Sequence, residues 1–112
     1  MSSSPAPDDA DIDMERAAKL ADEVAEVRRQ LAEVPAEQVV ANHAMGLFEL
    51  AAIHLQQSPP RLKDAALAID AMGAIVEGVG PERLGDAGPT LEDALTQIRL
   101  AFVQVKGTNA PA

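Results

Sequence analysis

Apolar residues recur at steps of three and four along four stretches of the chain, and this spacing predicts four helices. The expected helices are residues 12–33, 35–57, 61–77 and 91–106. Val34-Pro35 and Ser58-Pro59-Pro60 separate the first three, because a residue that precedes proline favours extended geometry. Glycines and prolines between residues 78 and 89 predict a loop with one short turn at 82–84. Thr90 is then the expected N-cap of the last helix, with Asp93 in a capping box.

The first predicted helix carries a single narrow apolar stripe on an otherwise charged surface. A stripe of this width is typical of an antiparallel hairpin or a coiled-coil seam rather than of a deep core. A second copy of the chain is a further candidate to cover it. The stripe consists of Ala17, Leu20, Val24, Val27 and Leu31.

The second predicted helix is apolar on almost every side and shows two stripes, so it needs two packing partners. The other helices of the chain supply one partner, and we expect a second copy to supply the other. Gly46 costs a helix about 1 kcal/mol relative to alanine, which close approach of another backbone would explain. Leu100 and Val103 form a further apolar patch opposite the core stripe of the last helix. The predicted self-association or partner interface comprises Val40, His43, Gly46, Leu47, Leu50, His54, Leu100 and Val103.

Composition favours an all-α fold, a small bundle of about four helices. The chain has no Trp or Tyr and only two Phe, so its core must be built from alanine and aliphatic side chains, which suit helices. Residues 11–106 are expected to form one helical domain. Residues 1–10 have the composition of a disordered acidic tail, and residues 107–112 are expected to fray.

Net charge excludes several kinds of partner. Nine basic residues against eighteen acidic ones give −9, which opposes binding to nucleic acid or to an anionic membrane surface. The absence of Cys removes disulfides and thiolate metal sites. No targeting segment is recognisable at the start of the chain, so a cytoplasmic protein is expected.

Catalytic chemistry has little support in the sequence. His43 and His54 share a helix face but lie about 16 Å apart along the axis, too far to bind one ion together. Asp70, between Ile69 and Ala71, is expected at an exposed edge, and a buried carboxylate with a raised pKa is the alternative. No catalytic residue, cofactor site or metal site is therefore predicted.

Three segments together resemble a known bacterial family. The chain is similar to domain-of-unknown-function family 1844, especially its actinobacterial members, over about two-thirds of its length, residues 31–105. The positions that look like family positions are Pro35, Ile69, Asp70, Leu100 and Phe102. The segments that carry the resemblance are Leu31-Ala32-Glu33-Val34-Pro35-Ala36 followed by Val39-Val40, the run Ala65 to Met72, and Leu91 to Phe102.

The resemblance implies a small, helical, cytoplasmic bacterial protein with no established activity. Family members tend to have histidine at the position of Gly46, and not at His43 or His54. Their genes often lie beside those for translation initiation factor 3 and two large-subunit ribosomal proteins, which implies a connection with translation.

The sequence therefore predicts a non-enzymatic, homo-oligomeric helical interaction module. The expected partners are a second copy, with a homodimer favoured, and another protein, with neither nucleic acid nor membrane bound directly. The alternative is a small metabolite-binding protein or enzyme with a pocket between helices, using Asp70 or His43 as its polar anchor.

Overall fold

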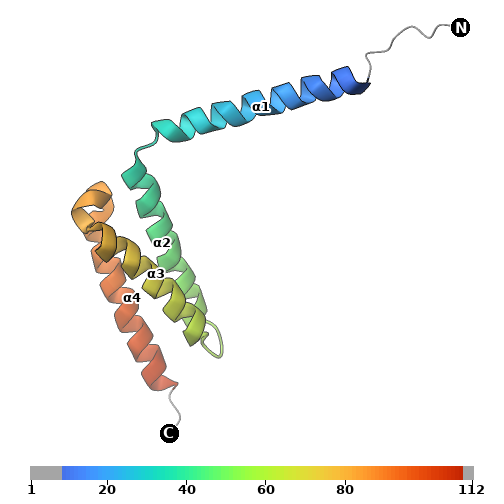
Figure 1. Ribbon diagram of the computed structural model, residues 1–112. Helices are drawn as coiled ribbons and strands as arrows, with labels where there is room; N and C mark the ends of the chain where they lie inside the picture. Colours follow the sequence, from blue (N-terminus) through green and yellow to red (C-terminus); the bar gives the residue numbers. More distant parts are fainter. Residues whose placement is uncertain (1–8, 110–112) are drawn as a thin grey trace, which may run out of the picture. The chain divides into compact units, whose positions relative to one another are not determined.

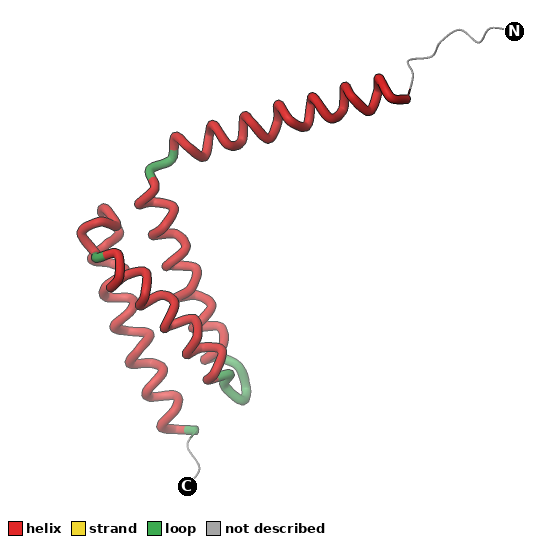
Figure 2. Tube along the Cα trace, in the orientation of Figure 1, coloured by secondary structure: helices red, strands yellow, loops and turns green. Residues whose placement is uncertain are grey.

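The computed structural model describes residues 9–109, and these residues contain helices and no strand (Figure 2). The all-α prediction with four helices is confirmed. Asp9 and Ala10, expected in the tail, belong to the first helix, and Gly107 and Thr108 belong to the last. Residues 1–8 and 110–112 lie outside the described part, so the predicted tails are largely not covered. The elements are α1 Asp9–Glu33, α2 Ala36–Leu55, α3 Leu62–Val79, the 3-10 helix η1 Pro81–Ala87, and α4 Gly88–Thr108.

The chain divides into two compact units, residues 1–34 and 35–112, where one domain over 11–106 was expected. The first unit contains α1. The second contains α2, α3, η1 and α4, and each of these four elements packs on the other three. The boundary falls at Val34-Pro35, the first helix break that the sequence indicates.

The second unit is a three-helix bundle whose successive helices run in alternate directions, with η1 joining α3 to α4 (Figure 1). Small residues make much of its core: Ala44, Ala51 and Ala65 are completely buried. Such residues bring helix backbones close together, and α2 and α3 share the most extensive interface. The larger buried side chains are Leu55, Ile69, Met72, Val76, Leu84, Leu91, Leu95 and Ile98.

Helix α2 packs residues from both of its apolar stripes within the bundle. It contacts α3 and α4, which serve as the two partners that the sequence requires. Val40 and Leu47, which were assigned to an intermolecular interface, are half-buried and pack against the core. Met45 and Phe48, from the other stripe, pack against the same core. These side chains therefore need no second copy of the chain to cover them.

The predicted short turn at 82–84 is present, and it belongs to a longer 3-10 helix, η1, that the sequence did not predict and whose backbone is non-helical at Gly85. The N-cap of α4 is Ala87, and Thr90 lies inside the helix without a capping hydrogen bond. Prolines stand in the first turns of both η1 and α4, where a missing backbone N–H costs nothing. Gly88 is buried, and a side chain there would collide with the backbone of Pro81. Pro81 and Pro89 thus lie at the starts of η1 and α4, whereas Gly80 ends α3 and Gly85 interrupts η1.

Helix α1 has no buried residue over its 25 residues, and Ile12 alone among them is half-buried. Its outer surface is stabilised by ion pairs within the helix. Arg29 bonds Glu26, with Nη2 2.6 Å from Oε1, and Glu33, with Nη1 3.1 Å from Oε1. The Arg29 hydrogen bond holds the pKa of Glu26 below its ordinary value. Charge pairs at these spacings favour the helix itself.

Candidate protein-interaction surfaces

The side of α2 that faces away from the bundle core carries a row of exposed residues at alternate steps of four and three. We call this row the outer α2 stripe. Val39, Leu50 and Ile53 are 37%, 43% and 53% exposed, a large apolar exposure for side chains on an ordered helix. His43 and Gly46 are also exposed and lie between them. The outer α2 stripe is Val39, His43, Gly46, Leu50 and Ile53.

The structure thus divides the predicted α2 residues into two groups. His43, Gly46 and Leu50 lie in the outer α2 stripe, whereas Val40 and Leu47 pack against the core. His54 is half-buried. Sequence reasoning missed Val39 and Ile53, which complete the stripe at its two ends. The signal was present in their spacing to Leu50. It was hidden because neighbouring apolar residues form equally regular rows.

Gly46 has open space where a side chain would project. A Cβ built at this position has no atom within 4 Å, so the expected close approach of another backbone does not occur within the described part of the chain. The glycine leaves a gap midway along the outer α2 stripe, between His43 and Leu50. A neighbouring molecule would find backbone, not side chain, at this point.

Leu100 and Val103 on α4 are 58% and 66% exposed, as expected from their position opposite Leu95 and Ile98. Both residues point away from the core that α4 shares with α2 and α3. In a three-helix bundle the outward faces of different helices point in different directions. Of the eight predicted interface residues, Val40, Leu47 and His54 are half-buried and the other five are exposed.

The two histidines have different environments and share no site. His43 is exposed. His54 is half-buried, and its Nδ1 is buried without a hydrogen-bond partner among the described residues. The His54 carbonyl accepts hydrogen bonds from the backbone N–H groups of Gln57 and Arg61, at 3.4 and 2.9 Å, which ties the end of α2 to the start of α3. No group of three or more His, Asp or Glu within residues 9–109 could hold a metal ion.

Asp70 is exposed, so the alternative of a buried carboxylate is wrong. It lies near Arg99, whose guanidinium instead bonds Glu77: Nη1 is 3.0 Å from Oε2 and Nη2 is 2.8 Å from Oε1. These hydrogen bonds hold the pKa of Glu77 below its ordinary value. Gly73 lies beneath the guanidinium, which joins α4 to α3. We therefore assign this cluster to the packing of α4 on α3.

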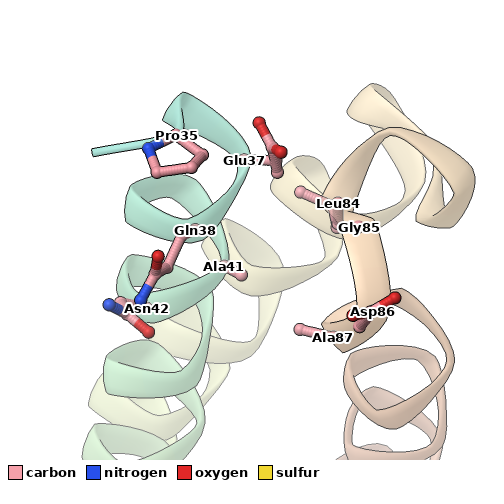
Figure 3. A pocket seen from close by; sticks show the side chains of 9 residues that line it. All are labelled: Pro35, Glu37, Gln38, Ala41, Asn42, Leu84, Gly85, Asp86 and Ala87. Carbon is pink, nitrogen blue, oxygen red and sulfur yellow. The ribbon is translucent and has the colours of Figure 1, made fainter. Parts of the chain in front are cut away.

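A cleft of about 410 Å³ lies between the start of α2 and η1, and Figure 3 shows its lining. Its polar groups are the carboxylates of Glu37 and Asp86 and the amides of Gln38 and Asn42. Neither His43 nor Asp70, the polar anchors proposed from the sequence, lines it. The carboxylates favour a cationic or hydrogen-bonding ligand over an anionic metabolite.

The charged side chains of α2 are all carboxylates, apart from its two histidines. No Lys or Arg occurs between Arg29 and Arg61, and the exposed Glu49 lies beside Leu50 in the outward part of the helix. The outer α2 stripe is therefore apolar with an acidic flank. It is suited to a partner that offers apolar side chains and a basic group.

Within the described residues, no helix combines the length and the apolar character needed to cross a membrane. Comparison with models of known families, with curated proteins and with solved structures found no match to this chain. The resemblance to domain-of-unknown-function family 1844 thus stays a prediction from the sequence segments that carry it.

Proposed function

We propose that this protein is a non-enzymatic, homo-oligomeric interaction module whose helical bundle binds another protein. The observation that carries the proposal is the outer α2 stripe, which exposes three large apolar side chains on a helix that is otherwise well packed. Exposed apolar rows of this kind are typical of surfaces that bind a helix of a partner. The proposal assigns no catalytic role to any residue in the described part of the chain, and no cofactor is part of it.

The partner is a protein segment with an apolar face and a lysine or arginine at its edge. The apolar face would cover Val39, Leu50 and Ile53, and the basic group would lie near Glu49. The gap at Gly46 would admit a bulky side chain of the partner. The resemblance to domain-of-unknown-function family 1844 supports a cytoplasmic bacterial protein with a partner from translation. The acidic surface of this chain supports a partner with a basic surface, because opposite charges are complementary.

The test is binding of the partner to variants of the outer α2 stripe. We expect Leu50→Glu and Ile53→Glu each to abolish binding, because a carboxylate would be desolvated against an apolar face. Leu67→Glu is the matched control, since Leu67 is 71% exposed on α3, outside the stripe. The partner is first cross-linked to the protein in cells and identified, and the purified pair is then measured by calorimetry. Undiminished binding by Leu50→Glu and Ile53→Glu would refute the proposal.

The alternative is binding of a small cationic molecule in the cleft between α2 and η1. The size of the cleft and its two carboxylates, Glu37 and Asp86, favour it. A thermal-shift screen of amines should then give saturable stabilisation, which Glu37→Gln and Asp86→Asn remove. Leu50→Glu would leave that stabilisation unchanged, so the two functions are separable.

A further inference from the structure

The apolar residues of α1 follow the repeat of a coiled coil. Ala17, Leu20, Val24, Val27 and Leu31 alternate at steps of three and four, which averages 3.5 residues and places them at successive a and d positions of a heptad. Leu20, Val27 and Leu31 are 61%, 53% and 62% exposed. A helix that uses this repeat has a narrow seam for another helix, and no residue of α1 is buried.

The same face of α1 has two shallow, open hollows between its side chains. One is lined by Leu20, Glu23, Val24 and Val27, with Arg28 at its edge. Four residues at positions i, i+3, i+4 and i+7 are the set that receives one side chain in knobs-into-holes packing. A second hollow includes the same pattern one step earlier, with Ala17, Leu20, Ala21 and Val24, and Ala25 and Arg28 also line it.

Charged residues beside the seam indicate what covers it. Glu23 occupies a g position and Arg28 the following e position, and neither forms an ion pair within the described residues. By contrast, Arg29 on the outer side is paired with Glu26 and Glu33. In a parallel coiled coil, g of one helix lies beside the next e of the other. A second copy in register therefore pairs Glu23 with Arg28 twice, once on each side of the seam.

An antiparallel alignment lacks these pairs. The antiparallel register that brings the two apolar stripes together places Val24 of one copy opposite Val27 of the other. That alignment sets Glu23 beside Gln30 and Arg28 beside Ala21. Asp9, Asp11 and Asp13 oppose the parallel arrangement by repulsion, but they precede Ala17, so the two helices can diverge before the seam begins. Charge complementarity therefore favours the parallel pair.

We propose that α1 forms a parallel two-stranded coiled coil with α1 of a second copy, with Glu23 of each chain paired to Arg28 of the other. This inference rests on the homo-oligomeric part of the proposed function and assigns it to α1. The outer α2 stripe is then left free for a different protein. Because the seam spans little more than two heptads, the dimer is expected to dissociate at micromolar to millimolar concentrations.

The first experiment measures the mass of the full chain by sedimentation equilibrium, with interference optics because the chain has no Trp or Tyr. Val24→Asp should shift the chain to monomer. Glu23→Arg and Arg28→Glu should each weaken the dimer severalfold, and a mixture of the two variants should restore it. Asp22→Arg, on the outer side of α1, is the matched control and should change nothing. Failure of the mixture to restore association would overturn the pairing.

The second experiment reports the orientation. Because the chain has no Cys, Ala17→Cys introduces a single thiol. In the parallel register two such thiols adjoin and oxidise to a cross-linked dimer. In the antiparallel alignment they lie about 25 Å apart, given 1.5 Å rise per residue. Ala18→Cys, one position round the helix, is the control and should cross-link far more slowly. Equal cross-linking rates for the two variants, or no cross-linking of either, would overturn the parallel arrangement.

Separate readouts distinguish this proposal from the proposed function. Val24→Asp should yield a monomer that still binds its partner through the outer α2 stripe, with unchanged thermal unfolding of the bundle. Leu50→Glu should lose the partner and remain a dimer. Loss of self-association in Leu50→Glu, with Val24→Asp still dimeric, would place the dimer interface on α2 and overturn the inference.

Discussion

Arg99 on α4 donates hydrogen bonds to both carboxylate oxygens of Glu77 on α3, and its guanidinium lies over Gly73. The two hydrogen bonds, 3.0 and 2.8 Å long, make this a bidentate pair between helices that are distant in sequence. The side chains of Arg99 and Glu77 are 45% and 62% exposed, so water screens much of the attraction. The pair orients α4 on α3 and adds little to the total stability.

The Glu77–Arg99 pair should make the stability of the bundle depend slightly on pH. Arg99 lowers the pKa of Glu77 in the folded state, so the unfolded chain binds a proton first as the pH falls. The stabilisation is present at neutral pH and is lost as the pH falls through the folded pKa. Glu77→Gln should therefore unfold at a slightly lower temperature than the native chain at pH 7.

The difference between Glu77→Gln and the native chain should vanish in acid. Circular dichroism during heating, repeated across the acidic range, measures it. Glu92→Gln is the control, since Glu92 is exposed on α4 and forms no ion pair within the described residues. A Glu77→Gln difference that persists unchanged in strong acid would contradict this role of the pair.

Gly46→Ala should stabilise the bundle. Alanine favours a helix interior over glycine by about 1 kcal/mol, and the new Cβ would meet no atom within 4 Å. Chemical denaturation followed by circular dichroism gives the difference in unfolding free energy. If the gap at Gly46 receives a partner side chain, the same variant should bind the partner more weakly. Gain of stability with loss of binding is the expected combination.

Gly88→Ala should have the opposite effect on stability. The added Cβ would overlap the carbonyl of Pro81, and this obstacle is backbone, which cannot rotate away. Overpacking of this kind typically costs about 1–3 kcal/mol. Denaturation of Gly88→Ala beside Gly46→Ala compares the same substitution in a closed and an open site. Equal stability of the two variants would show that η1 adapts at no cost.

Leu84→Ala should destabilise the bundle by about 2–5 kcal/mol, because Leu84 anchors η1 in the core and is only 2% exposed. Leu67→Ala removes the same atoms from a side chain that is 71% exposed, and should change stability by less than about 0.5 kcal/mol. Urea titrations of both variants test the contrast. A small effect of Leu84→Ala would mean that η1 can detach without unfolding the bundle.

The helix breaks were predictable because proline acts locally. Val34-Pro35 separates α1 from α2, and Ser58-Pro59-Pro60 ends α2, as the sequence indicated. The segment from Gly80 to Pro89 was not predictable in the same way. Gly80 and Gly85 do adopt positive φ, at 95° and 65°, yet each lies beside a short helical turn whose formation depends on burial of Leu84. That burial is a tertiary effect, invisible to local turn rules.

The interaction surface was predictable only in part for a geometric reason. Helix α2 is apolar around most of its circumference, so the sequence does not reveal which direction faces the core. The packing of α2 against α3 and α4 determines that direction. As a result Val40 and Leu47 face the core, whereas Val39 and Ile53 are exposed. The seam of α1 was easier to recognise, because charged residues border it on both sides.

The alanines buried on α2 and α3 reverse the usual mutational tolerance of a core. Truncation to glycine removes only one methyl group at these sites, and complete burial leaves no space for a larger side chain. The sites are Ala44, Ala51 and Ala65. A library that samples every residue type should accept glycine or serine at these sites more readily than valine or leucine. Large aliphatic residues are common in most protein interiors, but here they would push α2 and α3 apart.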